Sequence, residues 1–227
     1  MVKNPALAER QSFLRSLGTL ATQARQVGEA RVSEAGPWSR HGAPSYRLLV
    51  LSHAARLPGL ASLIPHLPRD CAIVFRDYSD PERATVGRAL RGLCARHAVG
   101  FFVAGDVALA RRLGADGFHV PGWLLPHVGS WSGFSGLVTA ACHRPGDLQR
   151  AARGGAHAAL LSPVFPTQSH PGAPALGRQR FLAWAARSPL PVFALGGVTV
   201  DNAAGLRAPT MAGLAVIGAV HMPLPLR

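Results

Sequence analysis

The sequence predicts a (β/α)8 TIM barrel with an extra N-terminal helix and a truncated last helix. Short apolar segments alternate with helical segments eight times between residues 46 and 218. The apolar segments are continuous, which indicates strands buried on both faces, as in a parallel sheet. Eight such units within about 180 residues fit a compact barrel, and an open doubly wound sheet is the alternative. Only a short tail ending in PLPLR follows the last apolar segment, so we expect the eighth helix to be truncated.

The first element is an expected helix at residues 5–33. Its apolar residues, such as Leu7, Leu14, Leu17 and Leu20, recur at helical spacing with arginine and glutamate between them. This pattern predicts an amphipathic helix that packs on a larger body. We expect it to cover the gap at the eighth unit or the base of the barrel.

A linker and then the barrel follow this helix. The stretch EAGPWSRHGAPS, rich in glycine, proline and serine, predicts the linker. The expected organisation is therefore a helix and linker over residues 1–44 and a barrel over residues 45–227.

The elements of the barrel follow in order along the chain. Strands are expected near residues 46–52, 71–76, 99–104, 117–120, 136–141, 157–161, 191–195 and 213–218. Helices are expected near residues 55–67, 81–97, 107–113, 145–153, 178–186 and 199–207. Residues 121–135 form a broken segment without a clear period.

Charge favours a small anionic ligand over nucleic acid. The formal net charge is +13, but Lys3 is the only lysine among the 24 basic residues, and the arginines are scattered along the chain. No nucleic-acid-binding motif accompanies them, so nucleic acid is an unlikely partner.

Composition also bears on the compartment. Every apolar run of 18 residues or more is interrupted by charge or proline, and the N-terminus lacks the apolar core of a signal peptide, so we expect neither a membrane span nor secretion. The three cysteines, Cys71, Cys94 and Cys142, are widely spaced and form no CxxC pair, which argues against disulfides and structural zinc. A cytoplasmic protein is expected.

Glycines follow the last two expected strands. Gly196 and Gly197 end one strand, Thr199 then opens an expected helix, and Ile217 and Gly218 end the next strand. In (β/α)8 barrels the loops after strands seven and eight often bind phosphate, because backbone N–H groups reach the oxygens there. The alternative is that these are tight turns that need positive φ.

The segment SPVFPTQSHPGAPALG follows the sixth expected strand. Its four prolines exclude a helix or a central strand. Loops of this length inside a compact domain are usually functional. We therefore expect a functional loop here, which we call the flap.

Four segments together resemble the thiamine phosphate synthase family and its sister group, the thiazole tautomerases: the flap just quoted, LGADGFHVP, ALGGVTVDNA and AVIGAV. They occur in the family's order and at about its spacing, within residues 46–220. The resemblance implies a (β/α)8 barrel, often dimeric, that acts in thiamine biosynthesis. It implies a transferase that joins a thiazole phosphate to a pyrimidine pyrophosphate, with Mg²⁺ holding the pyrophosphate.

The resemblance assigns the binding of the phosphorylated ligand to seven positions: Thr167, Ser169, His170, Gly196, Gly197, Ile217 and Gly218. Thr167 and Ser169 match the hydroxyls of the family's T-x-T-K loop. His170 stands where the family has lysine, so its side chain reaches less far and loses its charge near neutral pH.

At the positions that bind the pyrophosphate and its metal ion in the family, this sequence departs from the family's pattern. The family's Q-L-R-E-K run corresponds to residues 74–78, which keep Arg76 as a candidate catalytic residue and Asp77 as an acid. The family's metal-binding acids align with Gly105 and Leu124. Mg²⁺ prefers carboxylate oxygens, so Asp77 and Asp106 are the remaining metal candidates.

Two further interpretations stay open. The acid/base histidine of the tautomerases aligns with Pro163, and His143 after strand five or His119 within strand four could replace it; His143 is the catalytic candidate. Trp123 and Trp131 could stack on a heterocycle or cover an apolar patch. The chain could also be a regulatory barrel that keeps the phosphate site without the chemistry.

Overall fold

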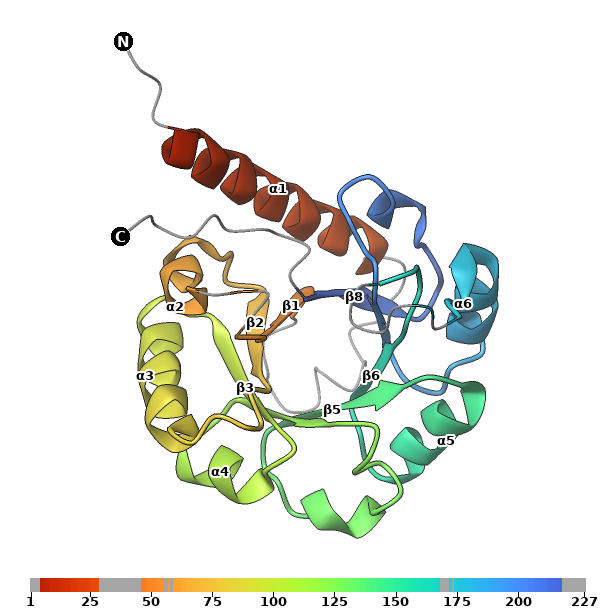
Figure 1. Cartoon of the computed structure of the whole chain (residues 1–227). Helices are drawn as coiled ribbons and strands as arrows, with labels where there is room; N and C mark the ends of the chain where they lie inside the picture. The colour runs from red at the N-terminus through yellow and green to blue at the C-terminus, as the bar shows by residue number, and fades with distance from the viewer. Residues whose placement is uncertain are drawn as a thin grey trace.

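The computed structural model describes residues 5–28, 46–54, 57, 59–167, 172 and 174–217. In this part of the chain eight parallel strands close into a barrel in sequence order, with β8 pairing back to β1 (Figure 1). The strands are β1 Leu48–Leu51, β2 Cys71–Phe75, β3 Gly100–Ala104, β4 Gly117–Val120, β5 Leu137–Cys142, β6 Ala158–Leu161, β7 Val192–Leu195 and β8 Met211–Val216. The predicted TIM barrel is confirmed, and the alternative prediction of an open doubly wound sheet is wrong. Each strand lies within two residues of its expected bounds.

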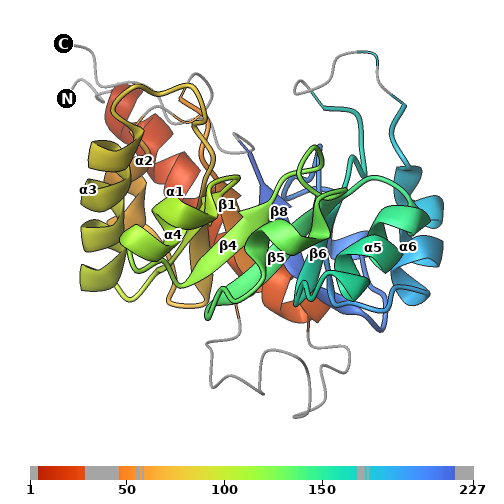
Figure 2. The same cartoon turned by 90° about the horizontal axis from the view of Figure 1, so that it is seen from below.

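Helices form a ring outside the strands (Figures 1 and 2). The α-helices are α1 Pro5–Gly28, α2 Leu60–Leu63, α3 Arg83–Arg96, α4 Val107–Arg112, α5 Pro145–Arg153 and α6 Gly177–Ala186. Short 3-10 helices are η2 Ile64–His66, η3 Val128–Trp131 and η4 Ala203–Gly205. The expected truncated last helix would fall in residues 218–227, outside the described residues.

The helix expected at residues 199–207 is wrong. Only the single 3-10 turn η4 forms there. The side chain of Asn202 accepts a hydrogen bond from the Thr199 N–H at 2.9 Å and donates one to the Gly197 carbonyl at 2.9 Å, so the segment closes as a turn instead of continuing as a helix. A helix dipole therefore contributes nothing to an anion site after β7.

Aromatic rings fill the base of the barrel interior. Tyr46 and Phe102 pack edge to face with their ring centroids 5.5 Å apart. A Cβ atom at Gly100 would collide with the Tyr46 ring, and one at Gly117 would collide with the Phe102 ring. Small residues beside large ones thus close the N-terminal end, and the polar side chains of the interior lie nearer the C-terminal end of the strands.

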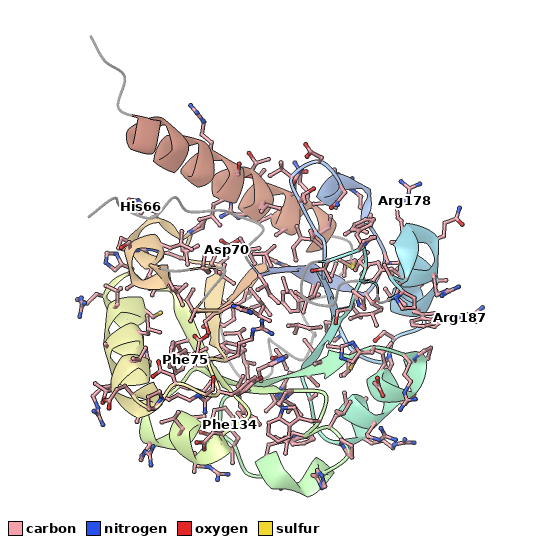
Figure 3. All side chains as sticks on the ribbon, in the orientation of Figure 1. His66, Asp70, Phe75, Phe134, Arg178 and Arg187 are labelled. Atoms are coloured by element: carbon pink, nitrogen blue, oxygen red, sulfur yellow. The ribbon has the colours of Figure 1, made fainter. Side chains whose placement is uncertain are left out.

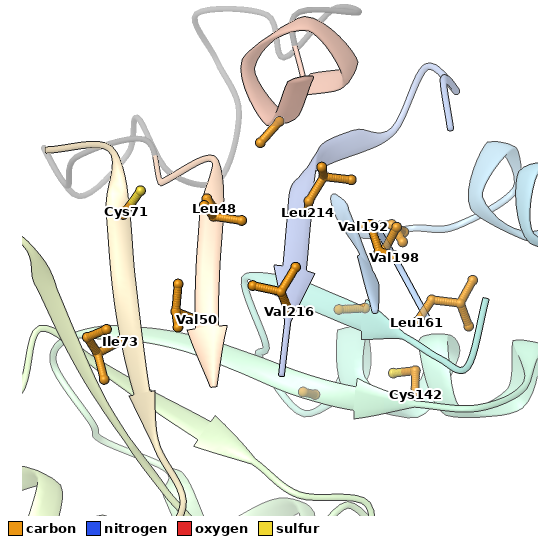
Figure 4. Packing of buried hydrophobic residues seen from close by; sticks show 14 of the residues in the cluster. Leu48, Val50, Cys71, Ile73, Cys142, Leu161, Val192, Val198, Leu214 and Val216 are labelled. Carbon is orange, nitrogen blue, oxygen red and sulfur yellow. The ribbon is translucent and has the colours of Figure 1, made fainter. Parts of the chain in front are cut away.

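A larger apolar layer lies between the strands and the helices. Figure 3 shows Phe75 on the inner side of α3, where its side chain is fully buried. In Figure 4, Leu48 of β1 and Leu214 of β8 lie side by side beneath α1, and both belong to the same buried cluster.

Helix α1 covers the seam between β8 and β1 (Figure 1). It buries one face against the barrel, made of Leu17, Leu20, Ala21, Ala24 and Val27. Its Gln23 side chain donates a hydrogen bond of 2.8 Å to the Val200 carbonyl in the loop after β7. The sequence-based boundary at residue 44 falls outside the described residues. In the described part of the chain, none of the helices combines the length and apolar character that crossing a bilayer requires.

A bidentate ion pair joins α1 to the loop before β2. Arg25 Nε lies 2.7 Å from Asp70 Oδ2, and Arg25 Nη2 lies 2.8 Å from Asp70 Oδ1. The Arg25 side chain is 44% exposed, so solvent screening keeps the contribution small. We expect Arg25→Gln to lower the free energy of unfolding by about 0.5–1 kcal/mol, and by less in high salt.

Urea denaturation at low and high salt measures this contribution. Arg15→Gln on the same helix is the control, because Arg15 is exposed and should have no effect on stability. Equal stability of Arg25→Gln and the wild type at low salt would show that the pair contributes nothing.

Candidate active site at the mouth of the barrel

Three of the side chains that the sequence singled out, Arg76, His119 and His143, lie in or directly after β2, β4 and β5 at the mouth of the barrel. Arg76 follows β2, and its backbone is fixed by the buried Ser52 after β1. The Arg76 N–H donates to Ser52 Oγ at 2.8 Å, and Arg76 Nε donates to the Ser52 carbonyl at 2.9 Å. Val74 belongs to the interior cluster, so strand alternation directs Arg76 inward as well.

His119 on β4 lies inside the barrel and is 4% exposed. Its Nδ1 is 2.9 Å from Thr139 Oγ1 on β5. Burial, together with the nearby positive charge of Arg76, lowers the pKa of His119 to about 3. His119 is therefore neutral at physiological pH and forms a polar floor beneath the mouth.

His143, directly after β5, is the exposed histidine of the mouth. Its Nδ1 lies 3.0 Å from the Ser162 carbonyl and 3.3 Å from Ser162 Oγ. A carbonyl oxygen only accepts hydrogen bonds, so Nδ1 carries the proton of the neutral ring and Nε2 keeps its lone pair. Nε2 faces the backbone of Gly122, 3.4 Å from the place a Cβ would take. This tautomer makes Nε2 the atom able to accept a proton.

Asp147 fixes the backbone of His143. Its Oδ2 accepts a hydrogen bond of 3.0 Å from the His143 N–H, and its Oδ1 pairs with Arg144 Nε at 3.2 Å. The carboxylate is nearly buried, with 8% of the residue exposed. His143 is thus held at both its backbone and its ring.

The first part of the flap packs directly against the glycines after β7. Gly196 and Gly197 have φ of 95° and 65°. A Cβ at Gly196 would lie 2.8 Å from Pro163 Cα, and one at Gly197 would lie 2.5 Å from the Pro166 carbonyl oxygen. Two backbone bonds of 2.9 Å hold the contact, from Val164 N–H to the Leu195 carbonyl and from Phe165 N–H to the Gly196 carbonyl. Figure 2 shows the described parts of the loop after β6 rising above one end of the barrel.

The same turn lies beside the end of β8. Leu195 pairs with Ala215, so the register carries Gly197 toward Ile217. Within the described part of the chain, the N–H groups of Gly197 and Val198 have no backbone acceptor. The tight-turn and phosphate interpretations are thus compatible, because the positive φ values serve the close packing and leave N–H donors for a ligand.

Three of the seven expected phosphate-binding residues, Ser169, His170 and Gly218, lie outside the described residues. The other four are described: Gly196, Gly197, Ile217 and Thr167, the last of these on the flap. The described part of the expected phosphate site consists of the turn of Gly196 and Gly197, the flap segment 163–167 and Ile217; after that expected ligand we call it the phosphate cradle.

The acids near the mouth do not fit a magnesium site. Asp77 Oδ1 accepts a hydrogen bond of 3.0 Å from the Ala54 N–H. Asp106 caps α4 by accepting from the Leu109 N–H at 2.8 Å, and its other oxygen is 3.9 Å from Arg83 Nη1. Among the described residues, no group of three or more acidic, histidine or cysteine side chains could hold a metal ion. Each acid is engaged by a backbone N–H donor, and Arg83 already supplies positive charge beside Asp106.

Sequence reasoning missed three residues of the mouth. Ser162 fixes the His143 tautomer, and strand alternation from Leu160 could have identified it as inward-facing. Asn202 closes the turn after β7, and Tyr78 stands 46% exposed at the rim. Of the two tryptophans, Trp131 is buried and donates to the Gly154 carbonyl, whereas Trp123 is 61% exposed.

Comparisons with known proteins agree with this architecture. The sequence model of the family described as thiamine monophosphate synthase matches residues 71–220. Thiamine-phosphate synthase of Thioalkalivibrio sulfidiphilus is 32% identical over 186 residues, which cover 73% of this chain and 88% of that protein. Thiamine-phosphate synthase of Methylobacillus flagellatus is 35% identical over 177 residues, covering 77% and 80%.

A solved structure supports the same fold. Thiamine phosphate pyrophosphorylase from Pyrococcus furiosus aligns with a TM-score of 0.67 and 24% identity, covering 80% of this chain and 90% of that chain. The family match covers β2 to β8 and the described mouth residues that follow these strands, but not Ser52 and Ala54 after β1. The chain therefore belongs to the thiamine monophosphate synthase family.

Proposed function

We propose that this protein acts in thiamine biosynthesis as a synthase-type barrel that holds a thiazole phosphate at its mouth and joins it to a pyrimidine pyrophosphate. The observation that carries the proposal is the phosphate cradle. Its turn, flap and strand end come from three separate parts of the chain and leave the N–H groups of Gly197 and Val198 without backbone acceptors among the described residues. Such a group of N–H donors is suited to a phosphate.

In the coupling reaction, the thiazole nitrogen forms a bond to the methylene carbon of the pyrimidine. The bond from that carbon to the pyrophosphate oxygen breaks, and pyrophosphate leaves with the electron pair. Arg76 is the cation of this chain that would face the leaving group, since Ser52 holds it at the end of β2. The acids do not fit Mg²⁺, so no step is assigned to a metal.

A second candidate is a proton shift on the bound thiazole, as in the thiazole tautomerases. The observation that favours it is the His143 tautomer, which leaves the Nε2 lone pair on the side of Gly122. A general base needs an accessible lone pair at hydrogen-bond distance from the proton it removes. His143 would take this role in place of the histidine that aligns with Pro163.

We place this activity in a reducing compartment such as the cytoplasm. Cys71, Cys94 and Cys142 are free and buried, and burial raises the pKa of Cys94 and of Cys142 to about 12. Buried thiols of this kind are inert structural residues and not nucleophiles.

One set of incubations tests the proposal. The protein is mixed with thiazole phosphate and pyrimidine pyrophosphate, with MgCl2 or with EDTA, and the product is followed by fluorescence after oxidation to a thiochrome. Thiamine phosphate formation that is lost in Arg76→Gln supports the coupling reaction. Exchange of thiazole protons with solvent deuterium, without coupling and lost in His143→Gln, supports the proton shift. Thermal stabilisation by thiazole phosphate without either reaction supports the regulatory barrel, and no stabilisation at all contradicts the proposed ligand.

A further inference from the structure

One polar side chain borders the apolar face of α1. Gln23 is partly buried, and Leu20 and Ala24 near it on the helix are fully buried. Its Nε2 donates a hydrogen bond of 2.8 Å to the Val200 carbonyl in the loop after β7. Its Oε1 is buried too, but it accepts no hydrogen bond from the described residues. A buried acceptor without a donor lowers the stability of a fold, so packing alone does not account for an amide at this position.

The apolar part of α1 already packs against the same loop. Ala203 of η4 and Leu206 after it are fully buried and belong to one cluster with Leu20 and Ala24. Figure 1 shows the last turns of α1 next to the blue segment between β7 and β8. These apolar contacts hold the loop against the helix. The hydrogen bond from Gln23 adds something different, because it fixes the position and direction of one peptide group.

That peptide group belongs to the turn that carries the cradle's N–H groups. Asn202 accepts a hydrogen bond from the Thr199 N–H and donates one to the Gly197 carbonyl, both at 2.9 Å. The turn from Gly197 to Asn202 is therefore one hydrogen-bonded unit, and the Gln23 amide is attached to it at Val200.

The turn is held from two sides. On the flap side, a Cβ at Gly197 would lie 2.5 Å from the Pro166 carbonyl oxygen, so the two backbones are in direct contact. On the α1 side, Gln23 holds the Val200 carbonyl. Hydrogen bonds weaken steeply when the donor is misaligned. A turn fixed from both sides therefore keeps the N–H groups of Gly197 and Val198 in one direction.

We propose that Gln23 is a positioning residue for phosphate binding. Through the Val200 carbonyl it holds the turn after β7 in the geometry that presents the Gly197 and Val198 N–H groups to the phosphate. The inference rests on the proposed function, because it requires a phosphate in the phosphate cradle. Helix α1 thereby acts on the site from outside the barrel, and the amide is retained for its donor although its acceptor has no partner among the described residues.

Gln23→Met separates this role from a purely structural one. Methionine is similar in length and removes both the donor to Val200 and the unpaired Oε1. Calorimetric titration is expected to show about tenfold weaker binding of thiazole phosphate, as for partial loss of one hydrogen bond to a charged oxygen. Binding of the thiazole alcohol without the phosphate should not change. The urea midpoint should stay at about the wild-type value, because one unpaired oxygen is exchanged for another and the side chain becomes apolar.

A matched control and a second measurement accompany this variant. Gln26→Met is the control, because Gln26 lies on the same helix and is exposed; it should keep the wild-type affinity for thiazole phosphate. A double-mutant cycle combines Gln23→Met with Asn202→Ala. Both substitutions act on the same turn, so the double variant is expected to lose less binding free energy than the sum of the single variants.

Several results would overturn the inference: wild-type affinity for thiazole phosphate in Gln23→Met, equal losses for the phosphate ester and the alcohol, a clearly lower urea midpoint, or strict additivity with Asn202→Ala. Gly197→Ala is measured alongside. If it weakens binding of the ester and Gln23→Met does not, only the role of Gln23 is wrong. If neither variant weakens binding, the phosphate cradle itself is wrong, and this inference with it.

Discussion

Gly197→Ala is expected to lower the affinity for thiazole phosphate at least about 100-fold. Alanine at φ 65° is strained, and its methyl group would collide with the Pro166 carbonyl and the Phe165 side chain. The flap segment must then move off the turn, which also displaces the N–H groups of Gly197 and Val198. Each hydrogen bond to a charged oxygen contributes about 1.5–3 kcal/mol, so loss of one or two accounts for the effect.

Calorimetric titration with thiazole phosphate measures this change. Gly155→Ala is the matched control, because Gly155 has a similar φ of 77° but nothing within 4 Å of its Cβ position. This control should lose about 1 kcal/mol of stability and keep its affinity. Wild-type affinity in a folded Gly197→Ala protein would show that the turn after β7 does not bind the phosphate.

The free energy of unfolding is expected to fall as the pH drops from about 6.5 toward 3, because of His119. The folded pKa of about 3 lies below the ordinary value of 6.5. Between these values the unfolded chain binds a proton that the folded chain does not, so acid favours unfolding. Above pH 6.5 His119 is neutral in both the folded and the unfolded state, so it takes nothing from the free energy of unfolding there. The loss approaches about 1.4 kcal/mol per pH unit, on the order of 4 kcal/mol in total.

Urea denaturation across this pH range checks the effect. His119→Gln should lack this part of the pH dependence, while keeping a partner for Thr139. His127→Gln is the control, since His127 is exposed and should leave the slope unchanged. Parallel curves for the wild type and His119→Gln would mean that His119 takes up its proton as easily in the folded state as in the unfolded chain.

The elements of the fold could be predicted because their signals are local. Continuous apolar runs mark strands such as β4, Gly117–Val120, and the proline and polar pattern marks α5, Pro145–Arg153, both at their observed bounds. The helix after β7 was predicted incorrectly because side-chain bonding by Asn202 competes with helix formation, and periodicity does not register such competition.

The candidate site could be predicted only where one residue type carries the signal. The glycines after β7 indicate that another segment of backbone packs closely against them, and the flap does so. The different states of His119 and His143 depend instead on contacts across strands, with Thr139 in one case and Ser162 in the other.

The contact between the exposed rings of Tyr78 and Trp123 shows the same limit. Tyr78 and Trp123 are 45 positions apart in the chain and meet only because the barrel brings the ends of β2, β3 and β4 together. No local pattern in the sequence connects them.

The most direct test of the central claim is a calorimetric comparison of thiazole phosphate with the same thiazole alcohol lacking its phosphate, each titrated into the wild-type protein. The phosphate cradle predicts that the phosphate ester binds at least about 100-fold more tightly, since two charge-assisted hydrogen bonds are worth about 3 kcal/mol or more. Inorganic phosphate should compete with the ester. Equal affinity for the ester and the alcohol would contradict the claim that this barrel anchors its ligand by a phosphate.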